Sequence, residues 1–172
     1  IWALLAVNCH PEYSFPDNPS AKEQNSEAAL VNFLLQSELS GGGWALMGSN
    51  ADSDVTGMTL QALAPYYHKA GYENVTAAID RGLNKLSEMQ NDSGGYSTMG
   101  VETEESCAQI ITALCSLGID PETDSRFIKG GHWTIENLLS YHIDGSGFMH
   151  VKAGAGNNGG AAAGTLDGMA TE

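Results

Sequence analysis

The sequence has few basic residues. Seven lysines and arginines stand against 21 aspartates and glutamates, which gives a formal net charge of −14 at pH 7. Proteins that bind nucleic-acid phosphates or anionic membranes use clustered Lys and Arg. The chain also lacks an apolar run approaching the roughly 18 residues that span a bilayer. We therefore expect no nucleic-acid partner and no membrane span.

Cysteine is scarce as well. Cys9, Cys107 and Cys115 are too few for a disulfide framework, and the last two lie eight positions apart on one expected helix, too far apart to bridge. We expect buried free thiols. The cysteines do not decide the compartment, and we expect an extracellular or cell-surface location rather than a cytoplasmic one.

The chain also lacks a recognisable metal-binding pattern. Its five histidines show no typical ligand spacing, although His142, Asp144 and His150 flank one loop. Residues 50–54 resemble the start of a calcium loop without its glycine and distal glutamate. We therefore expect no metal and no cofactor.

One pattern is present three times: a glycine-rich turn followed by an aromatic residue, between two helical stretches. The copies read LLQSELSGGGW, ending at Trp44, QNDSGGY, ending at Tyr96, and LLSYHIDGSGF, ending at Phe148. From Trp44 to Tyr96 is 52 residues, and from Tyr96 to Phe148 is 52 again, so this spacing is the repeat period of the chain. Self-similarity at a fixed period of this size indicates a repeat architecture.

Two kinds of helical pattern alternate along the chain. The amphipathic stretches, which can cover a core, are residues 21–38, 74–90 and 132–142. The uncharged stretches, which need burial on most sides, are residues 1–8, 54–68 and 106–117, with the start of another at 168. A Gly- and Asn-rich loop, flexible or functional, precedes that last stretch. The alternation predicts an all-α protein with two layers of helical hairpins.

The clearest copy carries a family resemblance. Leu86-x-x-x-Gln90-x-x-x-Gly94-Gly95-Tyr96 resembles the Gln-Trp repeat of the terpene cyclase and protein prenyltransferase superfamily, whose members contain prenyltransferase and squalene oxidase repeats. A glutamine at a helix end can satisfy free carbonyls, and the double glycine permits a tight turn. The aromatic ring then packs over the turn.

The other two copies match this motif less closely. Gln36 to Trp44 in the first copy is a looser match, while the third keeps Gly147 and Phe148 but has His142 in place of glutamine. All of these are expected to be scaffold residues.

The resemblance implies an α/α toroid, in which two concentric layers of hairpins close around a ligand cavity. At this period, residues 1–172 form a single toroid-like repeat domain that amounts to about half of a ring. Transcobalamin-like domains and complement thioester domains share the toroid but have other functions, so the fold does not fix the function.

The best catalytic candidates are Asp52 and Asp54. In squalene-hopene-type cyclases the acid lies in an Asp-x-Asp-Asp-Thr stretch that opens an inner helix, and Asp52, Asp54 and Thr56 match three of its positions. Val55 replaces the last aspartate, so the acid cluster is incomplete. The alternative is that these aspartates cap a helix, with Asp54 as the main cap.

Other candidate ligand-binding residues lie on or beside the uncharged helices. They are Tyr66 and Tyr67 near the end of one helix and Glu104 and Glu105 at the start of the next, where the acids could also cap the helix. For the tyrosines the simpler explanation is core packing.

Two functions remain after these comparisons of motifs. The first is a non-catalytic binding or interaction module that takes a small apolar ligand or a protein partner. The alternative is an isoprenoid-processing enzyme that uses Asp52 and Asp54. Since both ends of the chain read as buried-type helices, we also expect self-association or a covalent continuation of the toroid.

Overall fold

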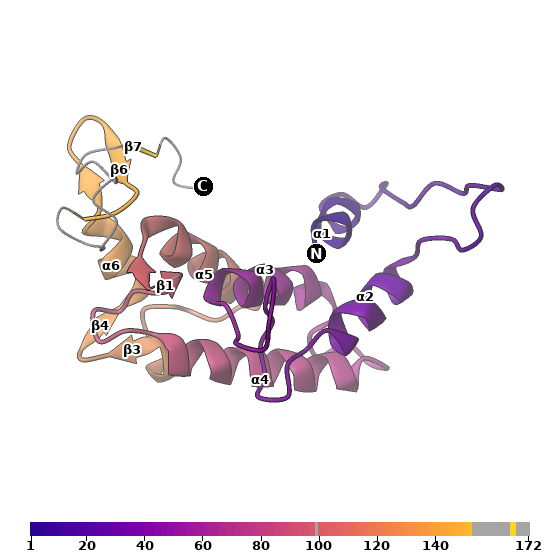
Figure 1. Ribbon diagram of the computed structural model, residues 1–172, viewed down its shortest axis with the longest axis horizontal. Coiled ribbons are helices and arrows are strands. Elements are labelled where there is room, and N and C mark those ends of the chain that lie inside the picture. Colours follow the sequence, from indigo (N-terminus) through magenta and orange to yellow (C-terminus); the bar gives the residue numbers. More distant parts are fainter. Residues whose placement is uncertain (99, 153–165, 168–172) are drawn as a thin grey trace.

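The fold is built of two layers of helices (Figure 1). The computed structural model describes residues 1–98, 100–152 and 166–167. One layer contains α1 (Trp2–Asn8), α3 (Ser53–Leu63) and α5 (Glu104–Ser116). The other contains α2 (Glu27–Gln36), α4 (Glu73–Met89) and α6 (Thr134–Leu139). The structure is mostly helical, as expected, but it is not all-α, because the described residues also form short antiparallel strands.

The first layer supplies the centre of the core. Helix α3 packs against α1 and α5 within its layer and against α4 in the other. Its buried face consists of Ser53, Thr56, Gly57, Thr59, Leu60, Ala62 and Leu63. Helix α4 is amphipathic, and its buried stripe is Val75, Ala78, Ile79, Gly82, Leu83 and Leu86. The contrast between uncharged and amphipathic sequences therefore corresponds to the two layers.

Short 3-10 turns and strands join the helices. The turns are η1 (Ala64–Tyr66) and η2 (Ser125–Phe127). Strand β1 (Ser97–Thr98) pairs with β2 (Val101–Glu102), and β3 (Ile128–Lys129) pairs with β4 (His132–Trp133), both antiparallel. A third antiparallel sheet has the order β5 (His142–Ile143), β6 (Gly147–Met149), β7 (Leu166–Asp167).

Several element boundaries differ from those expected. Helix α2 begins at Glu27 and not at residue 21, because the hydroxyl of Ser26 accepts the Ala29 backbone N–H at 3.1 Å and caps the helix there. Helix α6 is shorter than residues 132–142 because its flanking residues pair in β4 and β5. The helix expected from 168 lies outside the described residues, as does most of the loop before it.

Two expectations about burial were wrong. Only Cys107 is a buried thiol, since Cys9 and Cys115 are exposed, although all three are free as expected. Helix α1 is not enclosed on all sides, because only Leu4 and Val7 are buried while Trp2 is 69% exposed.

The repeat is visible in the backbone of the turns. In the first copy the N–H of Leu39 donates to the carbonyl of Gly43 at 3.0 Å. In the second copy Asn91 donates to Gly95 at 2.9 Å, and both partners lie one repeat period later in the sequence. In the third copy Ile143 lies opposite Gly147, one further period along the chain. The sequence period therefore has a structural counterpart in all three copies.

Two of these turns dock on the element that follows them in the other layer. A Cβ added to Gly42 would lie 2.9 Å from the backbone oxygen of Arg81 in α4. A Cβ added to Gly94 would lie 2.6 Å from the backbone oxygen of Trp133, at the start of α6. Arg81 and Trp133 are themselves separated by one repeat period, so the docking repeats with the sequence.

Gln90 and Tyr96, the motif residues of the second copy, are both buried. The Gln90 side chain is buried, and its Nε2 donates to the carbonyls of Gly94 and Phe127 at 2.9 and 2.8 Å. These carbonyls belong to the turn and to η2 rather than to the end of α4. Tyr96 is fully buried. Gln90 thereby ties its own turn to the next copy.

The first and third copies use their motif residues differently. Trp44 is buried, and its indole N–H donates to the Leu34 carbonyl at 2.7 Å. Gln36 is exposed and lies outside the core. Phe148 is only half-buried and meets the His142 ring edge-on, at 5.3 Å between centroids. The scaffold role expected of Gln36 is therefore not observed.

Candidate functional site

The two candidate acids both accept hydrogen bonds at the start of α3. Asp52 is the N-cap, and its carboxylate accepts the Val55 backbone N–H at 2.9 Å. Asp54 lies in the first turn of the helix and accepts the hydroxyl of Thr98 at 3.0 Å. The cap is therefore Asp52 and not Asp54, because only the residue before the first helical turn can turn its oxygen back onto the free N–H groups.

Thr56, the third match to the cyclase motif, also has a structural partner. Its buried hydroxyl accepts the backbone N–H of Trp44 at 3.0 Å and donates to the backbone carbonyl of Trp44 at 3.2 Å. The motif thus fastens the glycine turn of the first copy to α3. Asp52 and Asp54 each accept a hydrogen bond from a protein donor.

The corresponding residues of α5 are arranged differently from the expected caps. Thr103 is the N-cap, and its hydroxyl accepts the Ser106 N–H at 3.3 Å. Glu104 and Glu105 follow it in the first turn, where negative charge is favourable. Glu104 is fully buried, and the carboxylate of Glu105 lies 2.6 Å from Nδ1 of His150.

The two candidate tyrosines link the helical layers. The buried Tyr66 donates its hydroxyl to Glu27 at 2.8 Å and accepts from Asn8 at 3.2 Å. Burial, opposed by the Asn8 hydrogen bond, raises the pKa of Tyr66 to about 12. Tyr67 donates to Asp80 at 2.9 Å. The core role expected for Tyr66 is confirmed, and both hydroxyls already have protein partners.

The densest polar cluster surrounds Glu102, a residue that the sequence analysis missed. Its Oε2 accepts from Ser93 at 2.6 Å and Asn91 at 2.8 Å. Its Oε1 accepts from Asn137 at 3.0 Å and from Tyr141 at 3.3 Å. These donors come from the turn of the second copy and from α6 and its C-terminal end, so one carboxylate joins two copies.

The environment of Glu102 favours its ionised form. Burial alone would raise the pKa of this carboxyl, but hydrogen bonds from Ser93, Asn91 and Asn137 lower it on balance. The nearby Lys152, whose Nζ is 3.9 Å from Oε1, acts in the same direction. No sequence motif pointed to Glu102, because its donors converge only in three dimensions.

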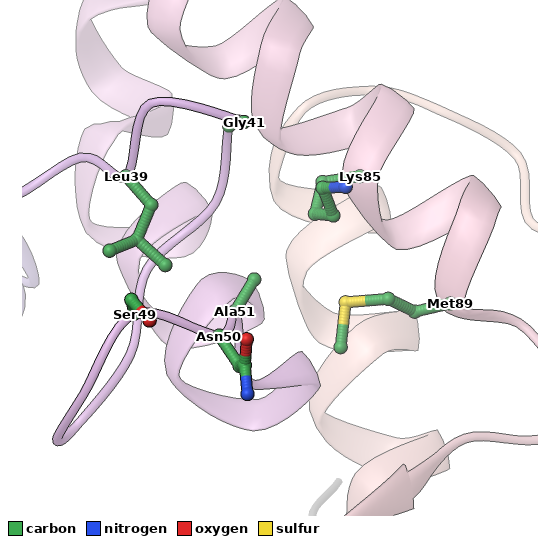
Figure 2. A pocket seen from close by; sticks show the side chains of 8 residues that line it. Leu39, Gly41, Ser49, Asn50, Ala51, Lys85 and Met89 are labelled. Carbon is green, nitrogen blue, oxygen red and sulfur yellow. The ribbon is translucent and has the colours of Figure 1, made fainter.

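Two surface clefts lie beside the docked turns. The first, of about 280 Å³, lies between the loop that contains Leu39, Asn50 and Ala51 and the α4 residues Lys85 and Met89 (Figure 2). The second has the same volume, and its lining includes Ser93, Asn137 and Lys152. Ser93 and Asn137 lie one repeat period after Gly41 and Lys85 of the first cleft. The clefts are therefore a repeated feature of the scaffold.

The described part of the chain contains no group of three or more His, Cys, Asp or Glu residues that could hold a metal ion. The residues considered as metal ligands in the third copy make two separate contacts. His142 lies 3.5 Å from Asp144, and His150 lies beside Glu105. Over the same described residues, no helix has both the length and the apolar character needed to cross a membrane.

Comparisons with known proteins give no family assignment. The chain matches no protein-family model, no curated protein and no solved structure.

Proposed function

We propose that the chain is a non-catalytic interaction module on an α/α-toroid scaffold of the prenyltransferase and squalene oxidase repeat type. Its binding surface would be the exposed face of α2 around Phe33, and its partner a further helical unit that carries a glycine–aromatic turn. Two layers of helices and a turn that recurs at a fixed period support this scaffold.

The repeat register carries the proposal. Phe33 lies 52 residues before Lys85, and Lys85 lies 52 residues before Asn137. Lys85 receives the turn of the first copy, since a Cβ on Gly43 would lie 3.0 Å from its Cγ. Asn137 receives the turn of the second copy in the same way, 2.7 Å from a Cβ on Gly95. Phe33 thus occupies the turn-receiving position of α2.

This position is uncovered on α2 within the described residues. Phe33 is 65% exposed, and Ala29, which corresponds to Arg81 beneath Gly42, is exposed too. Covering a phenylalanine stabilises a complex by about 1.5–3 kcal/mol. A turn would bury both residues, which favours a protein unit over a small apolar ligand.

The partner turn should carry a ring smaller than tryptophan. Gly82 of α4 leaves room for the Trp44 ring, because a Cβ there would lie 3.0 Å from its Cζ3. The corresponding residue of α2 is Leu30, whose side chain occupies part of that space.

A tandem protein tests the proposal. Residues 1–52 are duplicated directly before Ile1, with Trp44→Phe in the added copy, which places a glycine turn with a smaller ring one period ahead of the original α2. We expect amide hydrogen exchange in the second α2 to slow and the melting temperature to rise. Phe33→Asp in that α2 should abolish both gains. Leu139→Asp, which changes an exposed apolar residue of α6, should leave both gains intact. Equal exchange in the tandem and single proteins would refute the proposal.

The isoprenoid-processing alternative rests on Asp52 and Asp54, which both lie at the start of α3. Incubation with squalene and with polyprenyl diphosphates tests it directly. Product formed by the parent but not by a stably folded Asp54→Asn variant would favour the enzyme over the interaction module.

A further inference from the structure

We propose that Lys152 and Asn137 become covalently joined through their side chains, with Glu102 as the catalytic residue. The product is an amide between Nζ of Lys152 and Cγ of Asn137. It would fasten the segment after β6 to α6. This inference does not depend on the proposed function.

One carboxylate oxygen lies between the two reacting groups. Oε1 of Glu102 accepts a hydrogen bond from Nδ2 of Asn137 at 3.0 Å. The same Oε1 lies 3.9 Å from Nζ of Lys152. The nitrogen that would leave and the nitrogen that would attack therefore share a single neighbouring atom, which is suited to carry a proton from one to the other.

The amide of Asn137 is buried and fixed on both sides. Its Nδ2 also donates to the Ser93 carbonyl at 3.0 Å, and the side chain as a whole is 4% exposed. Its Oδ1 accepts from the thiol of Cys107 at 3.3 Å. Burial raises the pKa of Cys107 to about 12, so the thiol remains a donor to that oxygen. A donor at Oδ1 stabilises the negative charge that develops there during attack.

The amine is held close to the same carboxylate. Nζ of Lys152 lies 4.4 Å from the centre of the Tyr141 ring, and the Tyr141 hydroxyl donates to Oε1 of Glu102 at 3.3 Å. The lysine is thus placed between an aromatic face and its proton acceptor. Such positioning converts an encounter of two groups into an intramolecular step.

The step balances without any further reactant. The amine form of Lys152 attacks Cγ of Asn137, and the ionised Glu102 accepts a proton from Nζ as the Nζ–Cγ bond forms and makes that nitrogen acidic. The Cγ–Nδ2 bond breaks, and Glu102 returns the proton to the departing nitrogen, so that ammonia leaves and the carboxylate is restored. The second cleft, which Asn137 and Lys152 both line, offers ammonia a route to solvent.

The intact mass of the denatured protein tests the proposal. We expect it to be about 17 Da, the mass of ammonia, below the mass of the sequence. Trypsin localises the change, because no Lys or Arg lies between Gly130 and Lys152. An amide at Lys152 blocks cleavage there, so residues 130–172 should appear as one fragment that is lighter by the same amount. Loss of ammonia at another asparagine would leave cleavage after Lys152 intact.

Variants identify the reacting groups. Lys152→Arg keeps the positive charge but cannot form the amide, and Glu102→Gln keeps the shape but not the proton acceptor. Both should show the full sequence mass, whereas Lys85→Arg should still lose ammonia. The mass measurement on the parent protein does not depend on whether any variant folds. A parent protein of full mass, with normal cleavage after Lys152, would overturn the proposal.

Discussion

Gly42 and Gly48 have the same backbone conformation but different surroundings. Both have a φ of +81°, yet a Cβ on Gly42 would lie 2.9 Å from a backbone oxygen of α4, while a Cβ on Gly48 would meet nothing within 4 Å. A residue with a side chain would therefore be strained at both positions. Only Gly42 must also lack a side chain for the turn to dock.

Alanine substitutions separate these two effects. Gly48→Ala should lower the free energy of unfolding by about 1–2 kcal/mol, the cost of a left-handed L-residue. Gly42→Ala should lose about 1–3 kcal/mol more, because the turn or α4 must shift. Chemical denaturation measures both values. Equal losses would show that the turn does not need its close approach.

Asp52 and Asp54 are close in sequence at the start of α3 but accept different kinds of hydrogen bond. Asp52→Ala should cost about 0.5–2 kcal/mol of stability, and Asp52→Asn should cost little, since asparagine caps equally well. Asp54→Ala should cost less than Asp52→Ala, because Asp54 accepts a hydroxyl and no free helix N–H. A larger loss for Asp54 in thermal unfolding would contradict this capping assignment.

At the scale of elements, each turn is anchored by its aromatic residue to a different extent. Trp44→Ala and Tyr96→Ala should each lower the unfolding free energy by about 3–5 kcal/mol, as expected for large buried side chains. Phe148→Ala should cost less because that ring is only half-buried. If the three variants had the same stability, the graded burial of the turns would be wrong.

The junction between the second and third copies should weaken in acid. The folded-state pKa of Glu102 is lowered, so this carboxylate stabilises the fold above its unfolded-state pKa, near 4.5. The contribution disappears as the pH falls through the lower, folded-state pKa.

The matched comparison uses Lys152→Arg, which excludes the proposed amide and keeps the charge. Its unfolding free energy should fall between neutral pH and pH 3 by more than that of the Lys152→Arg, Glu102→Gln double variant. Parallel pH profiles would mean that Glu102 contributes no acid-dependent stability.

At the scale of the whole molecule, the net charge of −14 opposes compaction. Sodium chloride at pH 7 should screen the repulsion and raise the melting temperature. If the screening is worth about 1 kcal/mol, the shift is about 2–4 °C for a chain of this size. Near the sequence pI of about 4.5 the same salt should have little effect. A melting temperature independent of salt at pH 7 would contradict the prediction.

Much of the scaffold could be predicted from the sequence, whereas the densest polar cluster could not. The regular spacing of the glycine turns and the alternating polarity identified the turns and the two layers, because these patterns are local. Glu102 was missed because its donors come from positions 91, 93, 137 and 141. Helix ends shifted where side-chain caps and strand pairing competed with helical propensity.

The sequence by itself determined the period, the helical class and the acidic character of this protein. These depend on composition and on spacing along the chain. The tertiary structure alone decided which acid caps α3, which cysteine is buried, and which turn-receiving face is left exposed. It also brought Lys152 and Asn137 to one carboxylate. The cap of α3 is a local contact between Asp52 and Val55 that depends on where the helix begins. The other outcomes depend on residues far apart in the sequence, whose distances follow from helix packing rather than from local sequence.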